Sequence, residues 1–286
     1  MVVSQGCAEP LTLTEALVAA HARSGPFETF IGPIFSRTFE AAAMGFASYG
    51  AMGAAARLAR SGRLDIWPMH YSAVTDGFAT GRLRADVVLL QVARAPDGRL
   101  CATLSNDYAV AAARHARVVV AEVNAQAPWC CGAEIADLPI SHLVETDRPL
   151  APLPAAPPGP AEREIGRHVA GLIPDRATLQ LGIGALPDAI LAALAGHRDL
   201  GVHSGMISDG LVPLVEAGVI TSAGKSRDPG VIVTNTAFGT RRLWDFIDGN
   251  PQVRLTPAAY THAFDVIAGQ AGFVAVNAAL EVDLEG

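Results

Sequence analysis

The sequence predicts an α/β protein with open, mostly parallel sheets divided between two domains. Apolar, β-branched segments alternate with alanine-rich segments, as in DVVLLQVA (86–93), NDYAVAAARHA (106–116) and RVVVAEVN (117–124). A strand, a helix and a second strand in this order form a unit whose two strands run parallel. Each strand segment contains a continuous apolar run, VVLL (87–90) or VVVA (118–121), which indicates burial on both faces of a sheet. The length of 286 residues, half of them hydrophobic, is enough for a large core in two domains.

The first helix is predicted over residues 11–25. Thr12 or Thr14 is its expected N-cap, because a threonine hydroxyl can accept a hydrogen bond from a free N–H group of the first turn. Gly25 is expected to end the helix, because glycine adopts the left-handed conformation that follows many helices.

A proline-rich segment marks the boundary between the two domains. Six prolines lie in RPLAPLPAAPPGPAERE (148–164). Proline fixes φ and lacks an N–H donor, so this segment is neither a helix nor a central strand. We predict an N-terminal α/β domain over 1–150, a stiff linker over 151–162, and the first part of a second α/β domain over 163–286.

The alternation of strands and helices continues after the linker. The helix predicted over 162–173 has one apolar face, formed by Ile165, Val169 and Leu172. Strands are predicted at TLQLGIG, LGVHS, VIVTNT and FVAVN, and helices at PDAILAALAGH, SDGLVPLVEAG and TRRLWDFIDGNP.

The composition excludes several classes of protein. Charged residues are only 17% of the chain, too few for a disordered polyelectrolyte. The net charge is −7 and the basic residues are scattered, so nucleic acid is not an expected partner. The apolar runs are far shorter than a membrane span, and the first residues show no signal peptide. We expect a cytoplasmic protein that does not bind membranes.

The cysteines and histidines do not form a metal-binding pattern. Of the four cysteines, Cys130 and Cys131 are neighbours, which does not match the CxxC spacing of zinc and redox sites. The eight histidines include no HxxxH or HExxH arrangement. We predict free thiols and no bound metal.

A glycine turn is the first candidate for a ligand-binding segment. In LGIGALPDAI, Gly182 and Gly184 lie between a predicted strand and a predicted helix. Glycines let a ligand approach the backbone, and the start of a helix favours an anion. The third glycine of a dinucleotide-binding fingerprint is replaced by Pro187, so a tight structural turn is the alternative interpretation.

Two further polar segments follow predicted strands. QGCAEP (5–10) carries Gln5 and Glu9 and could equally be a turn with a solvated acid. HSGMISDG (203–210) could line a cleft, or Ser208 or Asp209 within it could cap the next helix.

The segment GTRRLWDFIDGNP also contains possible anion ligands. Arg241 and Arg242 could bind a phosphate with two parallel hydrogen bonds each, or they could lie on a solvated helix face.

Glu281 is the candidate nucleophile. It follows the apolar run FVAVN, and open parallel sheets place ligands at the carboxyl ends of their strands. The sequence has no GxSxG motif and no cysteine beside an obvious base, which favours a carboxylate as nucleophile. An ordinary solvated acid is the alternative.

Several segments together resemble the acetyl-CoA hydrolase/transferase family. This family is part of the class I CoA-transferases, which include 4-hydroxybutyrate and acetate CoA-transferases. The similar segments, in the family's order and spacing, are QGCAEP, ADVVLLQV, ARVVVAEVN, ATLQLGIGALPDAI, LGVHSGMISDGLVPLVEAGVIT, GTRRLWDFIDGNP and VNAALEVDL.

The resemblance implies two related, open α/β domains of the CoA-transferase type with the active site between them. It implies that Glu281 attacks an acyl-CoA thioester and that a covalent glutamyl-CoA thioester passes CoA to a carboxylic acid. If water is the acceptor, the enzyme is an acyl-CoA hydrolase. Coenzyme A and acyl-CoA are substrates, and no cofactor is permanently bound. The substrate or CoA contacts that the resemblance implies are Gln5, Glu9, Gly182, Gly184, His203, Gly205 and Met206.

The sequence also departs from the family after Glu281. Family members continue with a glycine-rich loop that donates hydrogen bonds to the thioester oxygen, whereas this sequence ends at Gly286. We expect a chain truncated after the glutamate segment, with an incomplete second domain. A non-catalytic fragment, or a subunit that needs a partner chain, is the alternative. Either is expected to cover its exposed core by forming a homo-oligomer, a dimer or tetramer, or by pairing with a complementing chain.

Overall fold

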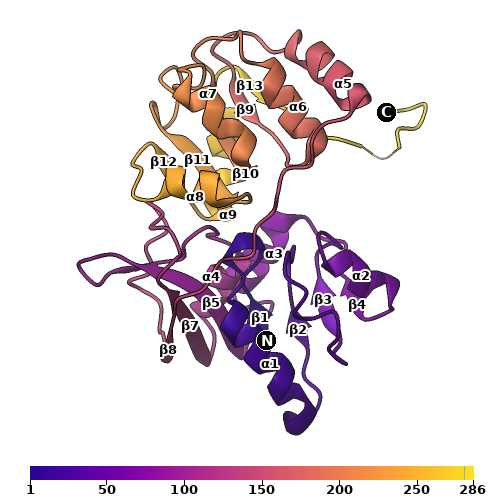
Figure 1. Ribbon diagram of the computed structural model, residues 1–286, viewed down its shortest axis with the longest axis vertical. Coiled ribbons are helices and arrows are strands. Elements are labelled where there is room, and N and C mark those ends of the chain that lie inside the picture. The colour runs from indigo at the N-terminus through magenta and orange to yellow at the C-terminus, as the bar shows by residue number, and fades with distance from the viewer. Residues whose placement is uncertain (280) are drawn as a thin grey trace.

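The computed structural model describes residues 1–279 and 281–286 and contains two α/β units, one above the other in Figure 1. Each unit is built on one mostly parallel sheet, which confirms the predicted fold class. Residues 147–159 connect the units without helix or strand. The domain boundaries proposed from the sequence stay a prediction.

The first sheet has the strand order β4-β3-β2-β1-β5-β7-β8, and β6 pairs with β5. All of its pairings are parallel except that of β6, which is antiparallel. Its strands are β1 (Val2–Val3), β2 (Thr29–Phe30), β3 (Phe46–Ser48), β4 (Leu64–Ile66), β5 (Val87–Arg94), β6 (Leu100–Cys101), β7 (Val118–Asn124) and β8 (His142–Thr146). The helices of this unit are the 3₁₀ turn η1 (Gly6–Ala8), α1 (Leu11–Ser24), α2 (Ala55–Arg60), α3 (Tyr71–Ala79) and α4 (Tyr108–Ala113).

The second sheet has the strand order β12-β11-β10-β9-β13, and all of its pairings are parallel. Its strands are β9 (Thr178–Gln180), β10 (Gly201–Ile207), β11 (Ile232–Ala237), β12 (Val253–Leu255) and β13 (Phe273–Ala275). Around it lie α5 (Pro160–Ala170), α6 (Ala185–Ala193), the 3₁₀ turn η2 (Asp209–Leu211), α7 (Val212–Glu216), α8 (Arg241–Ile247), α9 (Ala258–Thr261) and α10 (Phe264–Ala268).

The two sheets share one strand order. In each sheet the first strand, β1 or β9, lies in the interior, and the next three strands follow one another on one side of it. The chain then returns to the other side of the first strand with β5 or β13. Ligands of open α/β sheets bind at the carboxyl ends of the strands where the order reverses. A ligand site is therefore expected at the segments that follow β1 and β9.

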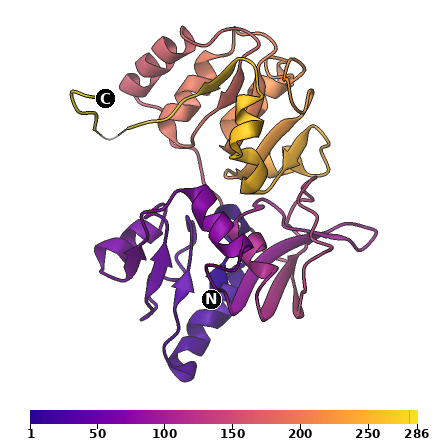
Figure 2. The same ribbon diagram turned by 180° about the vertical axis from the view of Figure 1, so that it is seen from behind.

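The two units are joined through a continuous core and through backbone hydrogen bonds. One cluster of buried apolar side chains includes Leu104 of the first unit and Phe238 of the second. The N–H of Ala237 donates to the Leu104 carbonyl at 2.8 Å. Figure 2 shows the same two units from behind, with the connecting segment between them.

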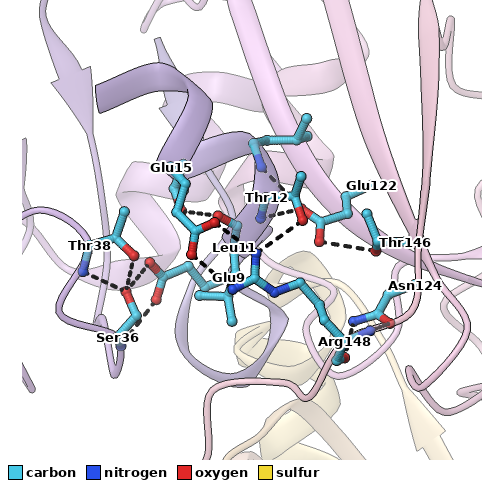
Figure 3. Close-up of polar contacts among 12 residues, drawn as sticks. Glu9, Leu11, Thr12, Glu15, Ser36, Thr38, Glu122, Asn124, Thr146 and Arg148 are labelled. Atoms are coloured by element: carbon cyan, nitrogen blue, oxygen red, sulfur yellow. Dashed lines mark hydrogen bonds and ion pairs between the residues drawn. The ribbon is translucent and has the colours of Figure 1, made fainter. Parts of the chain in front are cut away.

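The start of α1 differs from the sequence prediction. Neither Thr12 nor Thr14 caps the helix with its side chain, and Pro10 occupies the N-cap position. Instead, Oε2 of the buried Glu122 on β7 accepts hydrogen bonds from the N–H groups of Thr12 and Leu13, at 2.9 and 3.2 Å (Figure 3). A carboxylate 110 residues away in the sequence thus satisfies the free donors of the helix.

The predicted apolar face of the helix after the linker is wrong at two of its three residues. Val169 is partly buried and packs against the core, as predicted. Ile165 is 45% exposed and Leu172, just beyond the end of α5, is 82% exposed. The residues that α5 buries are Gly166 and Ala170. Small residues allow α5 to pack closely on α6, and this contact overrides the apolar spacing.

Within the part of the chain that the structure describes, none of the helices combines the length and apolarity that a membrane crossing requires.

The Glu122 contact predicts a stability effect. We expect Glu122→Gln to lower the free energy of unfolding by about 1–3 kcal/mol. The glutamine amide has only one oxygen, so it cannot accept hydrogen bonds both from the N–H groups of α1 and from the Thr146 hydroxyl. Urea denaturation measures the change. Glu15→Gln is the matched control, since the exposed Glu15–Arg148 ion pair should contribute less than about 1 kcal/mol. Equal effects of the two substitutions would contradict the proposed capping role.

Candidate active site

A cavity of about 410 Å³ lies between the two units. Its walls are segments that follow β2, β3, β9, β10 and β11, together with residues 153–156 of the connecting segment. The carboxyl ends of both sheets therefore meet around one space, which has the size of a typical small-molecule site. The lining residues are Pro33, Phe35, Met52, Gly53, Leu153, Pro154, Ala155, Ala156, Ile183, Gly184, Asp188, Met206, Ser208, Asp209 and Phe238.

The glycine turn after β9 forms part of this wall. Gly184 has φ of 109°, a conformation that side chains rarely adopt, and it precedes α6 directly. Gly184 and Met206 both line the cavity, and Gly182 and Met206 line a smaller neighbouring pocket. The structure thus brings together three of the predicted contact residues. Their contact with a substrate stays a prediction.

The cavity contains a carboxylate that the sequence analysis missed. Asp188 lies in the first turn of α6, and its Oδ1 accepts a hydrogen bond of 2.8 Å from the Ser208 hydroxyl. Burial raises the pKa of the Asp188 carboxyl above its ordinary value, and the neighbouring Asp209 carboxylate adds to the rise. The only local signal was an acid in the helix that follows a glycine turn, which is common in helices without a site.

Asp209 has a structural role instead. Its carboxylate accepts hydrogen bonds from the Thr240 N–H at 2.9 and 3.2 Å, from the Thr240 hydroxyl at 3.0 Å, and from the Leu243 N–H at 3.1 Å. Asp209 therefore caps α8. The sequence suggested that it would cap the helix that directly follows it.

His203 and Gly205 lie on β10 outside the cavity walls. His203 is 1% exposed and its Nε2 lies 3.0 Å from the Thr261 carbonyl. Burial lowers the pKa of its imidazole, which favours the neutral ring. A Cβ atom on Gly205 would lie 3.0 Å from the ring of His262. The two residues belong to the face of β10 opposite Met206, because side chains alternate along a strand. Their predicted contact with the substrate stays a prediction.

Gln5 lies two residues after the end of β1, where the strand order of the first sheet reverses. The Tyr49 hydroxyl donates to Gln5 Oε1 at 2.8 Å, and Gln5 Nε2 donates to the Tyr71 hydroxyl at 3.4 Å. The Tyr71 hydroxyl in turn donates to Asn235 Oδ1 on β11 at 2.8 Å. Gln5 thus belongs to a chain of hydrogen bonds that crosses from the first unit to the second.

The turn after Gln5 also packs closely on the second unit. A Cβ atom on Gly6, whose φ is 60°, would lie 2.2 Å from the Phe238 ring. Only glycine fits at this contact.

Glu9 is buried, which excludes the solvated acid that the sequence left open. It is 1% exposed, and its carboxylate accepts hydrogen bonds from the Ser36 hydroxyl at 2.6 Å and from the Ser36 N–H at 3.3 Å (Figure 3). Burial raises the pKa of Glu9 to about 7. Phe35, next to Ser36, lines the cavity, so Glu9 fixes the backbone beside one wall.

The two arginines of the helix after β11 form ion pairs on the surface. Arg241 pairs with Asp245 at 2.6 Å, and Arg242 pairs with Glu216 at 3.1 Å. All four side chains are more than half exposed. This favours the solvated helix face over a phosphate site.

Glu281 lies beyond the end of β13, in irregular chain. The segment after β13 begins beside the glycine turn, because the N–H of Val276 donates to the Gln180 carbonyl at 3.0 Å. Glu281 is exposed, and no hydrogen bond or ion pair holds its carboxylate to the residues that the structure describes. In Figures 1 and 2 this tail leaves the body of the second unit. The strand predicted at FVAVN ends at Ala275, and the catalytic role of Glu281 stays a prediction.

Metal ligands do not gather in the described residues. Over 1–279 and 281–286, no three histidine, cysteine, aspartate or glutamate side chains are grouped as a metal ion would require. The four cysteines are free thiols.

Comparison with protein families identifies the chain. Residues 1–152 match the N-terminal domain of acetyl-CoA hydrolase/transferase, and residues 239–286 match the C-terminal domain. The chain belongs to the acetyl-CoA hydrolase/transferase family. The resemblance found in the sequence motifs is thereby confirmed.

Individual relatives of the chain are CoA transferases. The 4-hydroxybutyrate coenzyme A transferase of Clostridium kluyveri is 41% identical over 228 residues, which are 79% of this chain and 53% of the relative. The succinyl-CoA:acetate/propanoyl-CoA:succinate CoA transferase of Fasciola hepatica is 36% identical over 230 residues, 79% of this chain and 48% of the relative. The chain thus spans about half the length of the curated relatives that it matches.

Solved structures show the same fold. The 4-hydroxybutyrate CoA-transferase of Porphyromonas gingivalis has a TM-score of 0.80 and 33% identity, and the match covers 99% of this chain and 70% of that one. RipA of Yersinia pestis has a TM-score of 0.88 and 26% identity, with the same coverage.

The buried carboxyl of Glu9 predicts a pH-dependent stability. Its pKa of about 7 lies above the ordinary value of 4.5, so the folded protein binds more protons than the unfolded chain between these values. Its contribution to stability is fully present below pH 4.5 and is lost as the pH rises through 7. We expect Glu9→Gln to remove this loss, on the order of 3 kcal/mol, from the pH profile of the free energy of unfolding.

Glu40→Gln, at a partly exposed acid of the same unit, is the control. Urea denaturation between pH 4.5 and 8 should give parallel profiles for this control and the wild type. The same parallel profile for Glu9→Gln would contradict the assignment.

Proposed function

We propose that the protein transfers CoA between an acyl-CoA and a carboxylic acid, and that the cavity between the two units holds the acyl group. The observation that carries the proposal is the position of the cavity, at the meeting point of the carboxyl ends of both sheets. Membership in the acetyl-CoA hydrolase/transferase family supports the same class of chemistry. The proposed setting is the cytoplasm, and a homo-oligomer or a complementing chain is the proposed assembly.

A carboxylate nucleophile would divide the transfer into simpler steps. We propose Glu281 for this role. Its carboxylate attacks the thioester carbonyl, the C–S bond breaks, and an acyl-glutamyl anhydride and CoA thiolate form. The thiolate then attacks the glutamyl carbonyl and releases the acyl group as a carboxylate, which leaves a glutamyl-CoA thioester. The acceptor carboxylate repeats the exchange in the opposite direction and takes the CoA.

The proposal requires the segment that carries Glu281 to approach the cavity when acyl-CoA binds. Support comes from the start of this segment, because β13 pairs with β9 and the glycine turn after β9 lines the cavity. The exposed position of Glu281 leaves its carboxylate free to move.

The family leaves the acyl group open. The relatives' names mention 4-hydroxybutyrate, whose free end carries a hydroxyl, and succinyl-CoA, whose free end carries a carboxylate. The choice between such groups must come from the cavity of the individual protein.

The nucleophile is tested by trapping the intermediate. Borohydride added with acyl-CoA should reduce a glutamyl thioester to an alcohol, and peptide mass spectrometry should locate the change at Glu281. We expect Glu281→Gln to abolish trapping and to lower the exchange rate by at least about a thousandfold, since the covalent route is lost. Glu285→Gln, at an exposed acid of the same tail, is the control. Full activity in Glu281→Gln would exclude this nucleophile.

The acceptor distinguishes transfer from hydrolysis, the second activity that the family name contains. We expect CoA exchange between acyl-CoA and added acetate to rise with the acetate concentration until it saturates. The measurement follows labelled acetate into acetyl-CoA and free CoA in parallel. Release of free CoA at a rate that acetate does not change, without labelled acetyl-CoA, would assign hydrolysis instead.

A further inference from the structure

The ionisable side chains that line the cavity are all acidic. Most of its walls are apolar, and the polar side chains that line it are those of Asp188, Ser208 and Asp209. Both ionisable groups are acids, and none of the lining residues that the structure describes is a lysine, arginine or histidine. The cavity therefore offers hydrogen-bond acceptors but no positive charge to an incoming group.

The carboxylates of Asp188 and Asp209 differ in how many hydrogen bonds they accept from the protein. Asp209 accepts hydrogen bonds from Thr240 and Leu243, so donors at the start of α8 stabilise its charge. Asp188 accepts a hydrogen bond from Ser208 at Oδ1, and its Oδ2 has no hydrogen-bond partner among residues 1–279 and 281–286. Oδ2 of Asp188 is thus available to accept a hydrogen bond from a ligand in the cavity.

An acid in an apolar cavity discriminates between chain ends of different charge. A second carboxylate beside it would be repelled, because like charges interact strongly where little water screens them. A methyl end fits the apolar walls without a charge penalty. A hydroxyl end can donate a hydrogen bond to the free oxygen of the acid.

We propose that Asp188 determines the acyl specificity of the cavity by rejecting chains that end in a carboxylate and accepting chains that end in a methyl or hydroxyl group. This inference rests on the proposed acyl-CoA function of the cavity. The acyl substrate is accordingly a short, uncharged monocarboxylic acid and not the half-thioester of a dicarboxylic acid. Ser208 positions the Asp188 carboxylate through the 2.8 Å hydrogen bond.

Equilibrium binding tests the inference without requiring turnover. The probes are three thioether analogues of CoA that carry butyl, 4-hydroxybutyl and 3-carboxypropyl chains, which lack the reactive carbonyl. Isothermal titration of the protein should show that the butyl and hydroxybutyl analogues bind at least tenfold more tightly than the carboxypropyl analogue. In Asp188→Asn, which keeps the size of the side chain and an acceptor for Ser208, the ratio should fall below about threefold, because the repulsion is removed.

The controls separate selectivity from folding and from the proposed function. Asp245→Asn removes a carboxylate of the same type from the exposed face of α8 and should keep the wild-type ratio. Asp188→Ser, which also removes the charge, should reproduce the effect of Asp188→Asn if thermal unfolding shows that either variant is less stable.

Three results would overturn the inference. Equal binding of all three analogues to the wild type would refute the selectivity and leave acyl-CoA binding intact. A wild-type ratio preserved in both Asp188 variants would refute the role of this residue. Failure of every analogue to bind would refute the acyl-CoA function itself, and the inference with it.

Discussion

The junction between the segment 104–106 and β11 fixes the relation of the two sheets. The Asn106 N–H donates to the Asn235 carbonyl at 3.0 Å, and the Asn235 side chain donates to the Asn106 carbonyl at 2.6 Å and to the Thr256 carbonyl at 2.8 Å. Asn235 is fully buried, so these bonds face no competition from water. β11 ends at the cavity, which both units line. Loss of these hydrogen bonds would therefore let the cavity wall of one unit shift relative to that of the other.

Buried carboxylates organise the segments around this junction. Asp107 accepts hydrogen bonds from the backbone of Gln5 and Ala109 and from the hydroxyls of Ser4 and Ser105, at 2.8 to 3.0 Å. The buried Glu122 and the half-buried Asp209 satisfy the first turns of α1 and α8 in the same way. An acid is stable inside a protein when donors surround it. The acids with fewer donors, such as Asp188, are then the ones left to interact with a ligand.

The sequence predicted the features that depend on local patterns. The apolar strands, their parallel arrangement and the end of α1 at Gly25 follow from the spacing of residue types and from the conformational freedom of glycine. The contact of Glu122 with Thr12 did not follow, because local patterns carry no information about partners 110 residues apart. The role of Asp188 was hidden for the same reason, since it depends on Ser208 and on walls from both units.

The shared strand order limits how Glu281 could reach the cavity. The strand order of the second sheet reverses between β9 and β13, so the glycine turn and the segment that carries Glu281 start side by side. Side-chain hydrogen bonds between Asn277 and Gln180, at 3.1 and 3.4 Å, fix the start of that segment. Four residues further along an extended chain lie at most about 14 Å away. In the proposed mechanism, Glu281 approaches the cavity from the side formed by the glycine turn, where Gly184 leaves the backbone open.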